Sequence, residues 1–239
     1  MSLQKIVYQS SRKSLPIRTF FHRLAFRLEL LLLSGYRKEV QVVELIRQIW
    51  KESDLSVTAG EAFLVHSLAQ RQRQVTGAMA EVGVYRGGTA KLICEAKGDV
   101  ALHLLDTFAG LPSPEQEDEG FFTEGWYAGR LEEVEAYLAG YDNVHFYAGD
   151  FPGTATGVEG TRFSFVHLDV DLYRSMKEGL AFFYPRLVPG GVILGHDYQL
   201  PGVRLAVDEY FDRVGERAIE LANSQFLVWA GDGRQGDEG

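Results

Sequence analysis

The hydrophobic positions of this chain follow two different spacings on either side of residue 78. Over residues 39–51 the apolar side chains recur every three or four positions, which predicts an amphipathic helix. Thr58 is followed three positions later by Glu61, and this capping-box pattern predicts a second helix that runs to about residue 72. The N-terminal part of the chain is therefore expected to be helical.

Beyond residue 78, short apolar runs alternate with segments of helical spacing. The runs of strand length are residues 78–84, 102–108, 144–148, 163–170, 192–194, 218–221 and 226–229. The helical segments between them are residues 88–97, 130–138, 175–187 and 203–214, the third beginning with a capping-box pattern at Ser175 and Glu178. Repeated strand–helix–strand order predicts a mostly parallel sheet with helices on both faces. The last two runs lack a helix-length spacer, so we expect them to form an antiparallel hairpin at one edge.

The predicted fold class is therefore α/β: a doubly wound, seven-stranded, mostly parallel sheet with an antiparallel last strand, preceded by an N-terminal helical extension. The extension covers residues 1–75, the main domain residues 76–231, and a loose tail without apolar periodicity residues 232–239. In open sheets of this kind, ligands bind outside the carboxyl ends of the strands. Functional side chains are therefore expected at those ends.

Charge is distributed unevenly along the chain. The whole sequence has 24 basic and 33 acidic residues, a net charge of −9. Residues 1–47 hold nine basic and three acidic residues, so this basic head carries +6 and the remainder −15. The acidic balance counts against nucleic acid as a partner, because phosphate binding needs a surplus of Lys and Arg. The basic head is expected to pack on the main domain or a neighbouring subunit in a homo-oligomer; peripheral contact with an anionic membrane surface is the alternative.

Two features indicate the compartment. The uninterrupted apolar run in the basic head covers only residues 30–33, which is too short to cross a bilayer or to form a secretory signal. The single cysteine, Cys94, excludes an intramolecular disulfide and fits a reducing environment. We therefore expect a cytoplasmic protein without a transmembrane segment.

A glycine-rich turn follows the first predicted strand, over residues 81–88 with the sequence Glu-Val-Gly-Val-Tyr-Arg-Gly-Gly. Glycines let the backbone turn sharply and approach a ligand, just before a helix whose N-terminus favours negative charge. The spacing differs from the G-x-G-x-x-G pattern of dinucleotide-binding folds. A turn that serves only packing therefore remains the alternative.

Acidic side chains lie at the ends of three successive predicted strands: Glu81, Asp106 and Asp150. Asp106 follows the start of the glycine turn by about 25 residues, where nucleotide-binding folds place the carboxylate that accepts a ribose diol. Unpaired carboxylates in one buried cleft would be costly unless a ligand or cation satisfied them. These side chains are therefore expected to converge on a ligand.

The fourth predicted strand continues into a polar ladder. Alternation places His167, Asp169 and Asp171 on one face, although a central parallel strand is normally apolar on both faces. Such departures cluster at functional sites. His167 lies deepest in this ladder and is expected to be a hydrogen-bonded core residue.

The fifth predicted strand ends in His196 and Asp197. Asp169 and Asp197 could together hold a hard divalent cation through oxygen, or they could only cap helices and pair with nearby arginines. His196 lies nearer the opening, and an imidazole there is suited to proton transfer.

Together these segments resemble the class I S-adenosylmethionine-dependent methyltransferases, and within them the macrocin O-methyltransferase family. The similarity spans about residues 55–230, with the motifs in the family's order. The segments that carry it are residues 80–88 (Ala-Glu-Val-Gly-Val-Tyr-Arg-Gly-Gly), 106–112 (Asp-Thr-Phe-Ala-Gly-Leu-Pro), 168–175 (Leu-Asp-Val-Asp-Leu-Tyr-Arg-Ser), and Asp197-Tyr198 followed by Pro201-Gly202.

The resemblance implies a Rossmann-like sheet and methyl transfer from S-adenosylmethionine to a hydroxyl of a small molecule, often a sugar or glycoside of a natural product. It also implies Mg²⁺ or another divalent cation, with Asp169, Asp197 and the residue at 196 as ligands. This chain has His196 where the family usually has an acid. Because Mg²⁺ prefers oxygen, the substitution implies a weaker site, a softer metal or no metal.

Methyl transfer to a hydroxyl requires a group that removes the proton of the acceptor, and we assign Asp169 or His196 as this catalytic base. The helices before residue 78 would act as a lid and substrate wall and build a dimer, with Glu61 expected to serve mainly as a helix cap. The cofactor would be held by Glu81, Gly83, Tyr85, Gly87, Gly88, Asp106, Thr107, Phe108, Asp150 and Phe151.

Two alternative functions remain at this stage. One is an NAD-dependent oxidoreductase on the same kind of sheet, against which the missing G-x-G-x-x-G pattern counts. The other is a nucleotide-binding or scaffold protein that keeps the pocket without turnover, against which the acids Asp169 and Asp197 count.

Overall fold

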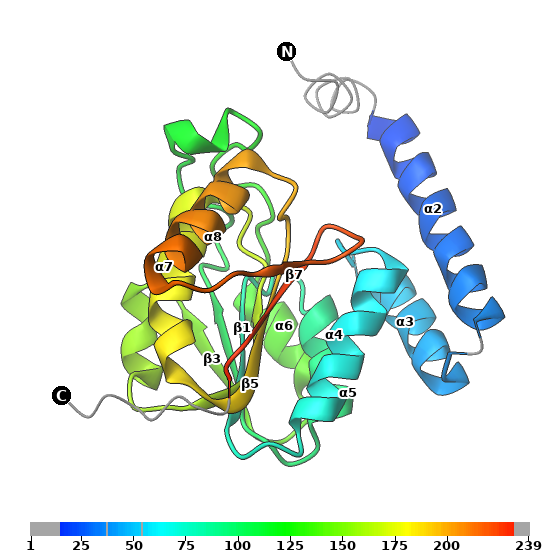
Figure 1. Cartoon of the computed structure of the whole chain (residues 1–239). Coiled ribbons are helices and arrows are strands. Elements are labelled where there is room, and N and C mark those ends of the chain that lie inside the picture. The colour runs from blue at the N-terminus through cyan, green and yellow to red at the C-terminus, as the bar shows by residue number, and fades with distance from the viewer. Residues whose placement is uncertain (1–14, 37, 54, 232–239) are drawn as a thin grey trace.

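The computed structural model describes residues 15–36, 38–53 and 55–231, and a seven-stranded sheet lies at its centre (Figure 1). The tail expected at residues 232–239 lies outside the described residues. The strands are β1 (Ala78–Val82), β2 (Leu102–Asp106), β3 (Val144–Ala148), β4 (Phe163–Leu168), β5 (Leu187–Gly195), β6 (Ile219–Glu220) and β7 (Phe226–Trp229).

The strand order across the sheet is β3-β2-β1-β4-β5-β7-β6. Strands β1 to β5 are parallel, whereas β7 runs antiparallel to β5 and β6 antiparallel to β7. The predicted fold class is therefore confirmed, including the antiparallel hairpin at one edge. Because β1 pairs with both β2 and β4, the order of the strands reverses beside β1, and such a switch point leaves a crevice at the carboxyl ends.

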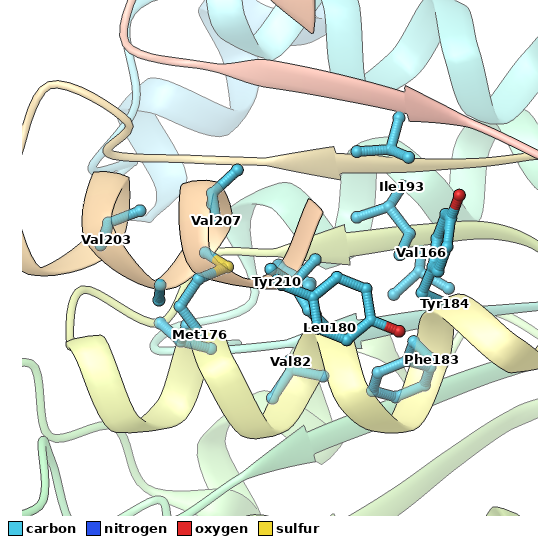
Figure 2. Packing of buried hydrophobic residues seen from close by; sticks show 14 of the residues in the cluster. Val82, Val166, Met176, Leu180, Phe183, Tyr184, Ile193, Val203, Val207 and Tyr210 are labelled. Carbon is cyan, nitrogen blue, oxygen red and sulfur yellow. The ribbon is translucent and has the colours of Figure 1, made fainter. Parts of the chain in front are cut away.

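Helices cover both faces of this sheet (Figure 1). Helices α7 (Tyr173–Phe183) and α8 (Pro201–Val214) pack on one face, where side chains such as Met176, Leu180 and Val207 meet Val166 and Ile193 of the sheet (Figure 2). Helices α4, α5 and α6 contribute to the core of the other face. The remaining helices are α2 (Leu15–Gly35), α3 (Val40–Glu52), α4 (Ala59–Gln72), α5 (Gly88–Lys97), α6 (Leu131–Leu138) and the short 3₁₀ turns η1 (Gln116–Asp118), η2 (Gly153–Val158) and η3 (Tyr184–Arg186).

Helix α4 begins with the predicted capping box. The Thr58 hydroxyl accepts a hydrogen bond from the Glu61 amide at 3.3 Å, and the Glu61 carboxylate accepts one from the Thr58 amide at 2.8 Å. Glu29 of α2 accepts a further bond from the Gly60 amide at 3.0 Å. The start of α4 is therefore fixed by its own sequence and by α2.

Helix α2 presents apolar side chains on more than one side. Phe26, Leu30 and Leu33 are buried with residues of α3 and α4, and Phe26 stacks on Trp50 with ring centroids 4.8 Å apart. A second set on the same helix is exposed: Leu24, Leu28, Leu31 and Leu32. Within the described part of the chain, no helix combines the length and apolar character needed to span a membrane.

Several predicted element boundaries differ from the structure, and two of these differences lie beside the cavity. Strand β4 ends at Leu168, so Asp169 and Asp171 lie in the loop beyond it and not on a strand face. Helix α7 begins at Tyr173, and Ser175 lies inside it without a capping role. The reason is a distant residue: the buried carboxylate of Asp118 accepts a hydrogen bond from the Tyr173 amide at 2.8 Å and so satisfies the helix start.

Candidate active site

A cavity of about 310 Å³ opens at the carboxyl ends of β1, β2, β4 and β5, beside the switch point. The turn after β1, the loop after β2 and the segments after β3, β4 and β5 all contribute to its wall. Of the residues predicted to form the site, the cavity is lined by Gly83, Tyr85, Gly88, Asp106, Thr107, Asp150, Phe151, Asp169, His196 and Asp197.

The glycine turn after β1 has a conformation and a packing that require glycine. Gly83 has φ +86°, and a Cβ added to it would lie 1.8 Å from the carbonyl oxygen of Asp169. Gly87 has φ +77° at the N-cap of α5 and does not line the cavity. The turn therefore lies directly against the loop after β4. Because both segments line the cavity, a shift of either one would displace the other.

The carboxylate of Asp106 organises this turn. One oxygen accepts hydrogen bonds from the amides of Val84 and Tyr85, at 2.6 and 2.9 Å, and the other accepts one from the Phe108 amide at 2.6 Å. Asp106 and Thr107 line the cavity, whereas Phe108 does not. Asp106 therefore joins the β1 turn to the β2 loop at the cavity edge.

Glu81 lies elsewhere than predicted. It is fully buried opposite His167 on the neighbouring strand β4, with its Oε1 2.8 Å from Nδ1 of His167, and it does not line the cavity. Burial raises the pKa of Glu81, although His167 and a hydrogen bond from Thr89 lower it. Because β1 continues through Val82, Glu81 lies within the strand, and its side chain meets that of His167 instead of reaching the cavity. The expectation of a core role for His167 is confirmed.

His196 is the centre of an acidic cluster. Its Nδ1 lies 3.3 Å from Oδ1 of Asp169 and 3.2 Å from Oδ2 of Asp197. On the other side of the ring, Nε2 lies 3.3 Å from Oε2 of Glu61 and 3.1 Å from the hydroxyl of Ser224. The ring is 8% exposed, so it is almost completely enclosed by these groups.

Glu61 and Ser224 are hydrogen-bonded to each other, and both contact the His196 ring. Oε1 of Glu61 accepts hydrogen bonds from both the amide and the hydroxyl of Ser224. Glu61 thus combines the predicted capping role with a contact to His196. Ser224 was not predicted, because a serine in the turn between β6 and β7 has no local signal; only the fold brings it to β5.

The charges of the cluster depend on one another. Burial disfavours a charged His196, but Asp169 and Asp197 outweigh it and raise the pKa of the ring well above its ordinary value. Burial and the charge of Asp197 raise the pKa of Asp169, whereas His196 lowers it, and the net shift is upward. For Asp197, His196 outweighs burial and lowers the pKa. Because the neighbouring carboxylates favour the charged ring, His196 is a weaker candidate for the general base than Asp169.

The surroundings of Asp171 favour its neutral form. Burial, followed by the charges of Asp197 and Asp169, raises the pKa of Asp171 well above its ordinary value. Its protonated carboxyl can therefore donate a hydrogen bond to Asp197, whose pKa that contact lowers.

The same cluster has the chemistry of a cation site. Asp169, His196 and Asp197 each offer one ligand atom, and these atoms lie within 4.8 Å of one another. Among the residues that the structure describes, none forms a hydrogen bond of good geometry with the buried Nδ1 of His196. An unpartnered buried nitrogen facing two carboxylates suits a divalent cation, although a nitrogen donor departs from the all-oxygen set that Mg²⁺ prefers.

Aromatic and apolar side chains form the outer wall of the cavity. They come mainly from the segment between β2 and α6 and include Phe121, Phe122 and Tyr127. From the N-terminal extension, Leu55 and Ser56, between α3 and α4, line the cavity. The long segment after β2 therefore supplies much of the wall that was expected from the N-terminal helices.

Comparison with known protein families gives one direct match. The model of the macrocin-O-methyltransferase (TylF) family matches residues 64–220. This range includes the glycine turn and the cluster residues Asp169, His196 and Asp197. Glu61 and Ser224 lie outside it.

Two similar curated proteins are O-methyltransferases of Streptomyces and Micromonospora. The chain is 34% identical over 157 residues to the 8-demethyl-8-(2,3-dimethoxy-alpha-L-rhamnosyl)-tetracenomycin-C 4'-O-methyltransferase of Streptomyces olivaceus, covering 59% of this chain and 60% of that protein. It is 32% identical over 175 residues to the mycinamicin III 3''-O-methyltransferase of Micromonospora griseorubida, covering 65% and 68%. The chain thus spans about 60% of the length of the first of these relatives.

Among solved structures, the O-methyltransferase NovP superposes with a TM-score of 0.61 at 22% identity, covering 73% of this chain and 81% of that one. This similarity supports the assignment of the fold.

Proposed function

Because the chain belongs to the macrocin O-methyltransferase family, we propose that it transfers the methyl group of S-adenosylmethionine to a hydroxyl group of a small molecule. The acceptor class that we propose is a sugar or glycoside of a natural product or glycan, in line with the rhamnosyl compound named for one relative. The supporting observation is one cavity that has a glycine turn on one side and an acidic cluster on the other. Neither alternative function is supported by the relatives.

The side of the cavity formed by β1 and β2 is suited to the cofactor. The amides at the start of α5, next to Gly88, favour a carboxylate such as that of the cofactor's methionine part. Asp106 accepts three amide hydrogen bonds and a long one, 3.5 Å, from the Thr107 hydroxyl, and a ribose diol would take the place of this weakest donor. Asp150 and Phe151 also line the cavity. Glu81 would support this arrangement only indirectly, through Thr89.

We expect Asp106→Asn to weaken S-adenosylmethionine binding by about 10- to 100-fold, equivalent to roughly 1–3 kcal/mol. Asparagine keeps a single acceptor oxygen and turns an N–H group toward the amides that the carboxylate binds. Calorimetric titration of both proteins measures the change. A dissociation constant equal to that of the parent would remove Asp106 from the cofactor site.

Transfer to an alcohol makes three demands on the protein. The sulfonium already activates the methyl group, so the chain must exclude water, align the acceptor oxygen and remove its proton. The apolar wall around Phe121 and Phe122 would exclude water and pack against a sugar ring. Asp169 lines the cavity with a raised pKa and is the base that we propose.

A divalent cation, when bound, would lower the pKa of the acceptor hydroxyl and orient it. The residues that would hold it are Asp169, His196 and Asp197, since their ligand atoms converge and Nδ1 of His196 is unpartnered among the described residues. Asp169 would then both face the cation and accept the proton, while Glu61 and Ser224 would keep the imidazole in position.

The proposed activity can be tested directly. The protein is incubated with S-adenosylmethionine and a panel of glycosides and phenols, and products are detected by mass spectrometry, with and without chelator. We expect a mass gain of one methylene unit on a glycoside. Binding of NAD in place of S-adenosylmethionine, or cofactor binding without any methylated product across the panel, would favour the alternatives.

We propose further that the protein is a cytoplasmic homo-oligomer assembled through α2. The exposed side chains Leu24, Leu28, Leu31 and Leu32 form an apolar surface next to the buried one, and a surface of this kind is usually covered by a partner. The single cysteine, Cys94, has no second cysteine in this sequence with which to form a disulfide, which fits a reducing compartment.

Replacing Leu28 and Leu31 with glutamate should therefore lower the mass in solution, measured by light scattering, from that of an oligomer to that of one chain. A parent that is already monomeric but sediments with anionic lipid vesicles would support peripheral membrane contact instead.

A further inference from the structure

The donor set at the cluster differs from an all-oxygen site by one atom. His196 supplies the imidazole Nδ1, which lies 3.3 and 3.2 Å from oxygens of Asp169 and Asp197. The ring is 8% exposed, and Nδ1 forms no hydrogen bond of good geometry with any of the described residues. The ring therefore directs Nδ1, which has no hydrogen bond of good geometry with the described residues, toward the space between two carboxylates.

The opposite edge of the ring is held in place. Nε2 faces Oε2 of Glu61 at 3.3 Å and the hydroxyl of Ser224 at 3.1 Å. A histidine that binds a metal through one nitrogen usually donates its other N–H to a carboxylate, which fixes the ring and makes the metal-binding nitrogen more basic. Glu61, on α4, has the position of that carboxylate.

We propose that this position selects a first-row transition cation such as Mn²⁺ over Mg²⁺, with His196 as the selecting ligand and Glu61 as its positioning residue. The proposal rests on the proposed function only in placing a cation in the cluster. One nitrogen and two carboxylate oxygens suit transition cations, whereas Mg²⁺ is bound mainly by oxygen and keeps several waters.

The charge of the cluster agrees with a cation. Three carboxylates, those of Glu61, Asp169 and Asp197, lie 3.2–3.3 Å from the nitrogens of a single imidazole. A divalent cation between Asp169 and Asp197 would compensate carboxylates that burial otherwise disfavours. The alternative occupant of this space is the proton of an imidazolium, which needs no metal, and the experiment distinguishes the two.

The test is binding of Mn²⁺ alone to metal-free full-length protein, followed by electron paramagnetic resonance. We expect one bound Mn²⁺ per chain, with electron spin-echo modulation from a directly coordinated ¹⁴N. His196→Asp should lose this nitrogen modulation and shift competition with Mg²⁺ toward Mg²⁺. No Mn²⁺ binding, or bound Mn²⁺ without nitrogen coupling in the parent protein, would overturn the proposal whatever the variants do.

Glu61→Gln tests the positioning role. Glutamine is accepted at this position of a capping box, so the start of α4 should be retained while the charge facing Nε2 is lost. We expect Mn²⁺ affinity to fall by about 10- to 100-fold, and thermal unfolding reports any loss of stability separately. Glu29→Gln is the matched control, because Glu29 also bonds the start of α4 through Gly60 but is not among the groups around His196. Equal affinities in both variants would overturn the role of Glu61.

Failure of this inference can be told apart from failure of the proposed function. Methyl transfer by a protein that binds no Mn²⁺ would retain the methyltransferase and overturn the cation site. Nitrogen-coupled Mn²⁺ in a protein that methylates no acceptor would retain the cation site and overturn the methyltransferase.

Discussion

Asp169→Asn is expected to lower kcat by about 100- to 10,000-fold, the usual contribution of a positioned general base. Asp169 faces the cavity from the loop after β4, and burial raises its pKa toward the range in which a carboxylate can accept a proton effectively. Asparagine has the same shape but cannot accept that proton. Single-turnover kinetics with a methylated glycoside as product would measure the loss, while calorimetry should show S-adenosylmethionine binding close to that of the parent.

Asp171→Asn is the comparison for this prediction. Asp171 lines the same cavity two residues away, but burial and its acidic neighbours raise the pKa of Asp171 well above its ordinary value and so favour its neutral form. Replacing a neutral carboxyl by an amide changes the local charge little, so a much smaller loss is expected. If the two variants lose activity equally, the effect belongs to the shape of the loop and Asp169 is not the base.

Gly83→Ala is expected to destabilise the protein by more than about 3 kcal/mol, which lowers the melting temperature by roughly 6–12 °C for a domain of this size. The added Cβ would lie 1.8 Å from the Asp169 carbonyl oxygen, and φ at this position is +86°. Either the β1 turn or the Asp169 loop must move, and both form the cavity. Loss of S-adenosylmethionine binding should therefore accompany the loss of stability, as measured by thermal unfolding with and without cofactor.

Gly215→Ala measures the cost of the left-handed backbone conformation without the steric clash that is present at Gly83. Gly215 has φ +72° at the C-cap of α8, and a Cβ there would meet no atom within 4 Å. Only the left-handed conformation then contributes, at about 1–2 kcal/mol. If the two variants lose the same stability, the backbone near Asp169 accommodates the added Cβ without further cost, and the steric part of the prediction is wrong.

Residues close in sequence explain why so much of the fold could be predicted. The capping box of Thr58 and Glu61 is formed by side chains and amides three positions apart, so its geometry follows from the helix itself. Helix α5 follows the glycine turn at the predicted residues, Gly88–Lys97. The order of strands and helices then allowed few topologies other than the observed sheet.

Predictions that depended on residues far apart in sequence were less accurate. Helix α7 starts at Tyr173 because Asp118, 55 residues earlier, bonds its first amide, and no local pattern shows this. Glu81 was expected at the cavity but pairs with His167 on β4, because the register between two strands decides which side chains face each other.

The amino-acid sequence by itself determined the elements, the sheet with its antiparallel edge, and the strand ends where Asp106, Asp169 and Asp197 lie. These features depend on periodicity and on short-range hydrogen bonds, which are properties of neighbouring residues. The tertiary structure alone decided that Glu61 and Ser224 meet His196, from positions 135 residues before it and 28 residues after it along the chain. Contacts of this kind depend on how α4 and the β6–β7 turn pack against β5, and burial in that packing sets the charges of the cluster.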